Sequence, residues 1–417
     1  MLSSKLGLKH ILPQIKGKRV LMRVDFNVKI KEGKIKDLTR ITSTIPSIKA
    51  ILDNGAKSLV MMSHLGRPDG HVVPSDSMKP IVPVLEELLK KKVTFVNDCV
   101  GPTVEEACKD PKEGSIMLLE NLRFHPEEEG QKVTNGKKEK SSKEDIAKFR
   151  KSLTKLGDIY VNDAFGTCHR AHSSMVGVNL PLKVAGDLLF KELESFARIM
   201  ESPSQPFIVI MGGAKVADKI KVIMKMLDKV NEMIIGGGMA FTFKKVLENM
   251  EIGDSLFDPE GAKIVPDIMK KAKEKNVKMH FPVDFLIGNK MDSTSMVNLV
   301  SEKEKIPKGS KMLDHGPITI ENFGKVIQNA KTILWNGPQG FFESGLFASG
   351  SYGILNDMIE ATKKGAITVA GGGETVALIE GKKGSSEKLT HVSTGGGASL
   401  ELLEGIELPG IASLSNK

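Results

Sequence analysis

Cysteine is scarce in this 417-residue sequence, and so are long apolar runs. The three cysteines, Cys99, Cys108 and Cys168, are odd in number and form no CxxC pair. Such usage suits a reducing compartment and argues against a disulfide framework or a structural zinc site. No apolar run approaches the ~20 residues that a membrane-spanning helix needs, and the first residues, MLSSKLGLKHIL, lack the apolar stretch of a signal peptide. We therefore expect a cytoplasmic protein with no membrane partner.

The common catalytic fingerprints are also missing. The sequence contains no GxxxxGK[ST], which excludes a Walker A nucleotide site, and no GxGxxG after a strand, which argues against a dinucleotide-dependent dehydrogenase. It has neither the HExxH spacing of a zinc hydrolase nor a Ser-His-Asp order. Any enzymatic chemistry must therefore come from other motifs.

Aromatic residues are few, although the chain is basic. One Trp and two Tyr accompany a net charge of +9, and this charge favours either nucleic acid or small polyanions as partners. Proteins that stack on bases interleave aromatic with basic residues, so the charge is the only support for nucleic acid. All eight arginines lie before residue 199, and every other basic residue is Lys. Because the guanidinium fork grips carboxylate or phosphate in a bidentate manner, the N-terminal half is predicted to bind a small anion.

The length and the alternation of elements predict two α/β domains. A chain of 417 residues exceeds the size at which one core keeps growing. Short β-branched runs alternate with helical stretches in both halves, which favours parallel sheets covered on both faces. The helical LLFKELESFARIM and the SPSQP that follows it mark the boundary, and the polar segment 130–143 is predicted to be a mobile insertion. LMRVDFNV is interpreted as one strand with Arg23, Asp25 and Asn27 on its polar face; a solvated face is the alternative.

Polar residues cluster where the predicted N-terminal strands end. The motifs are RVDFN, SHLGRP, ENLRFH and NDAFGTCHRAH. In a parallel sheet these ends share one edge, so we expect the side chains to converge there: His64, Arg67, Arg123, His169, Arg170 and His172. A lone His is more often structural, which remains the alternative for each.

Gly-rich turns end the predicted strands of the C-terminal half. They occur in FIVIMGGAK, EMIIGGGMAF, TILWNGPQGFFE, AITVAGGGETV and HVSTGGGASLELL. Turns of this kind that enter helices present backbone N–H groups to phosphates. Lys215 and Lys219 are predicted to lie on one helical face at such a turn. Glu343 and Glu374 are candidates for ribose hydroxyls and a hydrated Mg²⁺, although either is a plain surface carboxylate on the alternative view.

Taken together and in order, these motifs resemble the phosphoglycerate kinase family over essentially the whole chain. The family fold implies two doubly wound, Rossmann-like α/β domains that face each other across a cleft and are joined by a helix. The implied division is a domain for 3-phosphoglycerate or 1,3-bisphosphoglycerate (1–186), a connecting helix (187–202), a domain for Mg-ADP or Mg-ATP (203–404) and a tail that returns to the first domain (405–417). The implied reaction is reversible phosphoryl transfer from 1,3-bisphosphoglycerate to ADP in glycolysis.

The resemblance implies a role for individual residues. The substrate set is Val24, Asp25, Phe26, Asn27, Thr39, Arg40, Ser63, His64, Gly66, Arg67, Leu122, Arg123, His169 and Arg170. The nucleotide set is Gly213, Ala214, Lys215, Lys219, Gly237, Gly238, Met312, Leu313, Asn336, Pro338, Glu343, Gly371, Gly372, Gly373, Glu374 and Thr375. The catalytic residues implied are Arg40, Lys215, Gly372 and Gly373, with magnesium at Glu374.

Two positions depart from the family pattern. Glu374 stands where the family usually has Asp, and Ser310 and Met312 stand where Trp and Gly are more frequent, so the metal and adenine contacts carry over less directly than the phosphate contacts. The linker and the turn Ser393-Thr394-Gly395 are the expected hinges, and a monomer is expected. A nucleotide-binding module without catalysis is the remaining alternative, and the presence of Asp25 and Lys215 argues against it.

Overall fold

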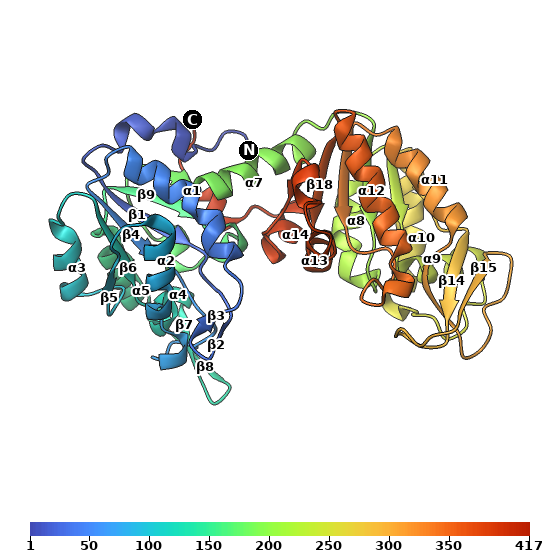
Figure 1. Cartoon of the computed structure of the whole chain (residues 1–417), viewed down its shortest axis with the longest axis horizontal. Coiled ribbons are helices and arrows are strands. Elements are labelled where there is room, and N and C mark those ends of the chain that lie inside the picture. The colour runs from blue at the N-terminus through green and yellow to red at the C-terminus, as the bar shows by residue number, and fades with distance from the viewer. The chain divides into compact units, whose positions relative to one another are not determined.

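Two six-stranded parallel sheets organise the computed structural model, which describes residues 1–417. The chain divides into unit 1, Met1–Glu194 with Glu407–Lys417, and unit 2, Ser195–Ile406. The fold class predicted from the sequence, two α/β parts built on parallel sheets, is confirmed (Figure 1).

The sheet of unit 1 has β1 near its centre. Its order is β10 (Lys183–Ala185), β9 (Ile159–Asp163), β1 (Arg19–Val24), β4 (Ser58–Met62), β6 (Ser115–Leu119) and β5 (Thr94–Val96). Every residue of β4 and β9 is buried, as expected for a parallel sheet covered on both faces. The helices are α1 (Thr39–Asp53), α2 (Val82–Leu89), α3 (Pro102–Lys109), α4 (Pro126–Glu129), α5 (Lys143–Thr154), α6 (Ser173–Val176) and α15 (Pro409–Ala412).

Short elements complete unit 1. They are the 3-10 turns η1 (Leu8–His10), η2 (Leu12–Gln14), η3 (Pro74–Asp76), η4 (Lys79–Ile81), η5 (Leu122–Phe124) and η6 (Phe165–Thr167), with the antiparallel pair β2 (Ile30–Lys31) and β3 (Lys34–Ile35). The C-terminal segment lies against the N-terminal one, since Lys5 pairs with Asn416 in a β-bridge and its Nζ donates to Leu414 O at 3.0 Å.

The sheet of unit 2 reads 3-2-1-4-5-6 when its strands are numbered in chain order. It runs β13 (Lys278–His280), β12 (Glu232–Ile235), β11 (Phe207–Met211), β17 (Thr332–Asn336), β18 (Ile367–Gly371) and β19 (His391–Val392). In sheets of this order, ligands bind beyond the strand ends where the order reverses. That point lies between β11 and β17.

Helices and a second, smaller sheet surround this core. The helices are α8 (Ile220–Met226), α9 (Met239–Glu248), α10 (Pro259–Glu274), α11 (Pro317–Gln328), α12 (Ser349–Lys363), α13 (Gly373–Gly381) and α14 (Gly397–Leu403), with the turns η7 (Ala217–Lys219), η8 (Gly345–Phe347) and η9 (Ser386–Lys388). An antiparallel sheet of β15 (Val297–Ser301), β14 (Asp284–Gly288) and β16 (Lys311–His315) was not anticipated from the sequence. Helix α7 (Asp187–Met200) contains the boundary between the units. No helix has the length and apolar character that crossing a bilayer requires.

One sequence prediction about local structure is wrong. The strand expected from Leu21 to Val28 ends at Val24, and the residues after it leave the sheet as a loop. The segment predicted to be a mobile surface insertion contains a β-hairpin that the sequence analysis did not predict, β7 (Gln131–Thr134) and β8 (Lys137–Lys140). Its turn is Asn135-Gly136, both with positive φ, of 51° and 76°, which is the pair that a two-residue hairpin turn favours.

Candidate functional site

The strand ends of unit 1 bring the predicted substrate residues to one edge. Val24 is the last residue of β1, and Asp25, Phe26 and Asn27 follow it; the residues 63–67 follow β4. Leu122 and Arg123 lie in η5 after β6, and His169 and Arg170 follow β9. All four strands run parallel, so these loops leave the sheet on the same side.

Backbone-directed hydrogen bonds lock these loops to one another. Phe26 N donates to Ser63 Oγ at 2.9 Å, and Gly66 N donates to Asn27 Oδ1 at 3.0 Å. Arg123 Nη1 donates to Gly66 O at 2.9 Å, and Leu122 N donates to Ser63 O at 3.1 Å. The loops after β1, β4 and β6 therefore form one framework in which side chains are held in fixed positions.

The buried side chain of Arg23 links residues of this edge by hydrogen bonds. No role at the site was predicted for it from the sequence. Its side chain is fully buried. Its Nε donates to Ser174 Oγ at 2.9 Å, and its Nη2 lies 3.1 Å from His64 Nδ1. The buried Glu128 accepts from Ser174 Oγ at 2.6 Å, which closes the network. One signal in the sequence could have revealed this role: Arg23 stands between apolar residues of a predicted strand. A charge buried in that way requires partners.

The arginines make the electrostatic potential at this edge positive. Burial, followed by the charges of Arg23 and Arg123, holds the pKa of His64 well below its ordinary value. Burial and the same two arginines lower the pKa of His172 to about 3. Both imidazoles are therefore neutral at pH 7 and avoid adding to a cluster of guanidinium charges. An anion bound here would contact more guanidinium groups than carboxylates.

Three further arginines reach the solvent at this edge. Arg40 occupies the first turn of α1, is 48% exposed and forms an ion pair with Asp25. Thr39 precedes it, and its Oγ1 donates to Asp37 Oδ1 at 2.6 Å. Arg67 and Arg170 are exposed. Exposed guanidinium groups over a rigid, buried framework suit the bidentate binding of phosphate or carboxylate.

Unit 2 contains a pocket of about 340 Å³ beside the point where its strand order reverses. Nine of the predicted nucleotide residues line it: Gly213, Ala214, Gly237, Gly238, Met312, Leu313, Pro338, Glu343 and Glu374. Seven other lining residues were not predicted from the sequence: Phe241, Asp254, Leu256, Met291, Lys311, Gly340 and Phe341. Phe241 comes from α9 and Lys311 from the small antiparallel sheet, and the other five lie in loops whose positions no local pattern reveals. The volume is within the range of small-molecule sites.

Glycines allow the loops around this pocket to approach one another. Gly213 N donates to Pro338 O at 3.0 Å, and Met239 N donates to Gly213 O at 2.9 Å. Gly237 has a φ of +62°, and a Cβ there would lie 2.7 Å from Gly213 N and from Pro338 O. Only glycine fits such a position without strain.

The remaining predicted nucleotide residues lie next to the pocket but do not line it. Lys219 Nζ contacts Asn336 Oδ1, and Thr375 Oγ1 accepts from Gly337 N at 2.8 Å. Asn336 Nδ2 is buried and has no protein partner, so it is available to a ligand. Gly371 ends β18, and Gly372 and Gly373 begin α13. The shared helical face predicted for the two lysines is wrong, because Lys215 lies in the loop before η7 and Lys219 ends that turn.

The residues around Glu374 fit a Mg²⁺ ion. Glu374 is exposed in the first turn of α13, lines the pocket, and acts electrostatically on Lys219. Mg²⁺ binds through one or two carboxylates together with substrate phosphates and waters. One exposed carboxylate among the residues that line the pocket matches that pattern.

The comparisons with known proteins assign this architecture to a family. The model of the family described as phosphoglycerate kinase matches residues 9–406. The chain belongs to the phosphoglycerate kinase family. It is 61% identical to a phosphoglycerate kinase of Sterkiella nova over 418 residues, covering all of both chains. It is 56% identical to phosphoglycerate kinase 1 of Homo sapiens, covering 100% of this chain and 99% of that protein.

Solved structures of phosphoglycerate kinases share the fold. The structure from Coxiella burnetii has a TM-score of 0.86 at 33% identity and covers 98% of each chain. The structure from Pyrococcus horikoshii OT3 has a TM-score of 0.76 at 30% identity, again with 98% of each chain. The chain is therefore a kinase with the glycolytic function of phosphoglycerate kinases, as the sequence motifs predicted.

Proposed function

We propose that this chain catalyses the reversible, Mg²⁺-dependent transfer of a phosphoryl group from 1,3-bisphosphoglycerate to ADP, giving 3-phosphoglycerate and ATP. In this reaction the P–O bond to the carboxyl oxygen breaks, and a P–O bond to a β-phosphate oxygen of ADP forms. The observation that carries the proposal is that the two units contain different sites: an arginine-rich edge in unit 1 and a glycine-lined pocket in unit 2.

The arginine-rich edge is the proposed site for the phosphoglycerate. Asp25 and Asn27 would hold the glycerate portion of the substrate, since Asp25 accepts from Asn27 N and Asn27 accepts from Gly66 N in the loop after β4. The phosphate and carboxyl groups would contact the basic set: Arg40, His64, Arg67, Arg123, His169 and Arg170. Because His64 and His172 are neutral when the edge is empty, a bound dianion would raise the pKa of each.

The glycine-lined pocket is the proposed site for the nucleotide. Met312, Leu313 and Pro338 would contact the base and ribose, with Glu343 on the ribose hydroxyls. Lys219 and Asn336 would contact the phosphates, since they touch each other beside the pocket. Met312, which departs from the family pattern, is flexible enough to fit a purine.

Positioning and electrostatics would supply the rate enhancement, because phosphoryl transfer leaves little covalent chemistry for a protein. Lys215 and Arg40 would stabilise the charge on the transferring group, and the backbone amides of Gly372 and Gly373 would assist. No general base is required, because both reacting oxygens are already anionic. Mg²⁺, held by Glu374 and the nucleotide phosphates, would supply further charge neutralisation.

The two proposed ligands bind different units, so the reacting groups must meet during turnover. We propose hinges in α7 and at Ser393-Thr394-Gly395, and exclusion of water when the ligands meet, which prevents hydrolysis of the acyl phosphate. We further propose that the protein is a monomer that acts on small molecules. We place it in the cytoplasm, in keeping with three cysteines that form no disulfide.

Hydrogen–deuterium exchange with each ligand alone tests the division of labour. We expect 3-phosphoglycerate to protect the loops after β1 and β4, and Mg-ADP to protect the loops after β11, β12 and β17. A coupled assay with glyceraldehyde-3-phosphate dehydrogenase and NADH should show turnover of ATP and 3-phosphoglycerate that requires Mg²⁺. Absence of turnover by folded protein would refute the proposal, as would protection of the same unit by both ligands.

A further inference from the structure

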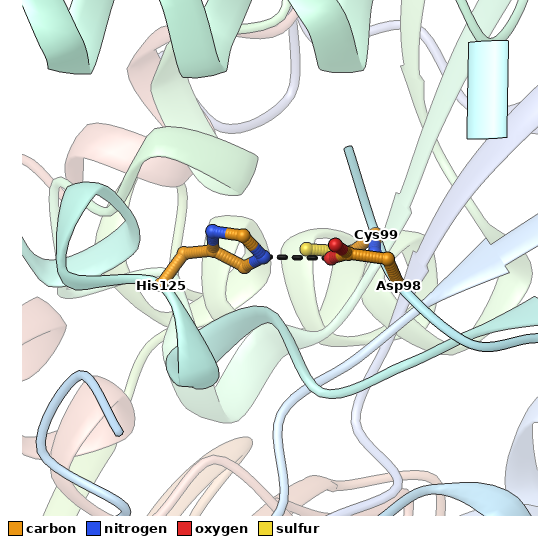
Figure 2. Close-up of side chains that lie close together, drawn as sticks. All are labelled: Asp98, Cys99 and His125. Atoms are coloured by element: carbon orange, nitrogen blue, oxygen red, sulfur yellow. Dashed lines mark hydrogen bonds and ion pairs between the residues drawn. The ribbon is translucent and has the colours of Figure 1, made fainter. Parts of the chain in front are cut away.

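Three side chains with metal-binding donor atoms meet in unit 1, apart from the proposed substrate residues. Asp98 and Cys99 lie in the loop between β5 and α3, and His125 lies between η5 and α4. One donor atom from each residue is within 4.8 Å of the other two. Figure 2 shows the Cys99 sulfur and the Asp98 carboxylate both directed toward the imidazole of His125.

The three donor atoms are gathered closely enough for one metal ion to reach all of them. Zinc bonds of ~2.0–2.3 Å place ligand atoms roughly 3.3–3.8 Å apart around a tetrahedron. His125 Nε2 is 2.6 Å from Asp98 Oδ1, where the two share a hydrogen bond. A cation that displaces this shared proton would therefore also move these two atoms apart.

Access and charge both favour a cation at this point. The side chains of His125 and Asp98 are 30% and 51% exposed, whereas Cys99 is buried. The exposed, negatively charged Asp98 would meet an incoming cation first, and the buried Cys99 sulfur would bind it from the protein interior.

We propose that Asp98, Cys99 and His125 form a zinc-binding site in which a water molecule completes the coordination. A thiolate with an imidazole is the donor set of Zn²⁺ and excludes Mg²⁺, which prefers oxygen ligands. On binding, the Cys99 thiol releases its proton to solvent, and so does the Asp98–His125 hydrogen bond, because both of its atoms become zinc ligands. The sequence argued against structural zinc because CxxC spacing is absent. That argument covers only sites with such spacing, which Asp98, Cys99 and His125 do not have.

Bound zinc would tie two loops together. His125 directly follows η5, which contains Arg123, and precedes α4, which contains Glu129. Arg123 Nε lies 3.4 Å from Glu129 Oε1 across this segment. Zinc would therefore link the loop after β5 to the segment that holds Arg123 and would raise the thermal stability of unit 1.

Titration of the chelator-treated, tag-free full-length protein with Zn²⁺ and with Co²⁺ tests the proposal. We expect one equivalent of Zn²⁺ to bind and to raise Tm, and bound Co²⁺ to show thiolate charge-transfer absorption. Cys99→Ser should abolish that absorption. Loss of groups outside the coordination sphere already weakens metal sites ~10–100-fold, so Asp98→Asn and His125→Gln should each weaken Zn²⁺ binding by at least ~100-fold.

Matched controls are Cys108→Ser, which removes another buried thiol of unit 1, and His71→Gln, which removes an imidazole that contacts Val133 O and none of the three proposed ligands. Both should leave Zn²⁺ affinity unchanged. Failure of the wild-type protein to bind Zn²⁺ would overturn the proposal. So would binding that survives all three ligand substitutions. Because Asp98 is exposed, Asp98→Asn remains informative if Cys99→Ser does not fold.

Discussion

Replacing Gly237 with alanine should damage the nucleotide pocket and leave the phosphoglycerate edge intact. Gly237 has a φ of +62°, and its added Cβ would lie 2.7 Å from Gly213 N and from Pro338 O. Both of these atoms belong to the backbone, so neither can rotate away. The loop after β12, which contains Gly237, must therefore move away from the loops after β11 and β17 by about 0.7 Å to restore an ordinary contact of 3.4 Å.

Two terms set the expected loss of folding stability in Gly237→Ala. A residue with a Cβ in the left-handed region costs ~1–2 kcal/mol, and forcing atoms into a filled space costs a further ~1–3 kcal/mol. Gly384→Ala is the matched control, because Gly384 has a φ of +75° and a Cβ added there would meet no atom within 4 Å. The control should lose only the first term, so the difference between the two variants isolates the collision between the loops.

Urea unfolding followed by tryptophan fluorescence measures this difference. Trp335 is the only tryptophan, is fully buried and lies in β17, so it reports on unit 2. Gly237→Ala should unfold at a lower urea concentration than Gly384→Ala and should raise the KM for ADP without changing the KM for 3-phosphoglycerate. Equal unfolding midpoints and equal KM values for ADP in the two variants would refute the reasoning.

Three other changes have defined outcomes. Arg40→Ala should lower kcat by ~10²–10³, the loss typical of one electrostatic group, with ADP affinity unchanged by calorimetry; a kcat within about threefold of wild type would contradict its role. Burial raises the pKa of Asp163 to about 7 from 3.8, so the native state binds this proton more tightly than the unfolded state, and stability should fall by up to ~4 kcal/mol as pH rises through that interval. Asp163→Asn should flatten this dependence in urea titrations followed by circular dichroism, and an unchanged slope would count against it. Glu374→Gln should weaken ADP binding with Mg²⁺ present but not in EDTA, and equal losses in both would exclude a metal ligand.

The positions of the site loops could be predicted because they follow from strand order. Each polar or Gly-rich motif comes directly after an apolar run, and parallel strands bring all such ends to one edge of a sheet. That reasoning placed Arg123 and Gly237 in loops after strands without any knowledge of tertiary contacts, whereas Asn27 was expected inside a strand that ends at Val24. It needed only the alternation of strands and helices.

The parts that escaped prediction depend on contacts between distant segments. Arg23 looked like a residue of a polar strand face, and only the buried Ser174 and His64 reveal its role. Leu256 and Met291 line the nucleotide pocket from segments whose own sequences carry no nucleotide motif. His125 joins Asp98 through folding alone, because the separation of the two along the chain matches no metal-binding pattern. The hairpin was the exception, since Asn135-Gly136 was a readable turn signal.

The most direct test of the central claim is the turnover of Lys215→Ala beside Lys263→Ala, an exposed lysine of α10 in the same unit. The coupled assay would give kcat for each variant, and calorimetry would give the affinity for ADP. We predict that Lys215→Ala loses at least ~100-fold in kcat while it still binds ADP, and that Lys263→Ala behaves as wild type. Wild-type turnover in Lys215→Ala would contradict the proposed mechanism.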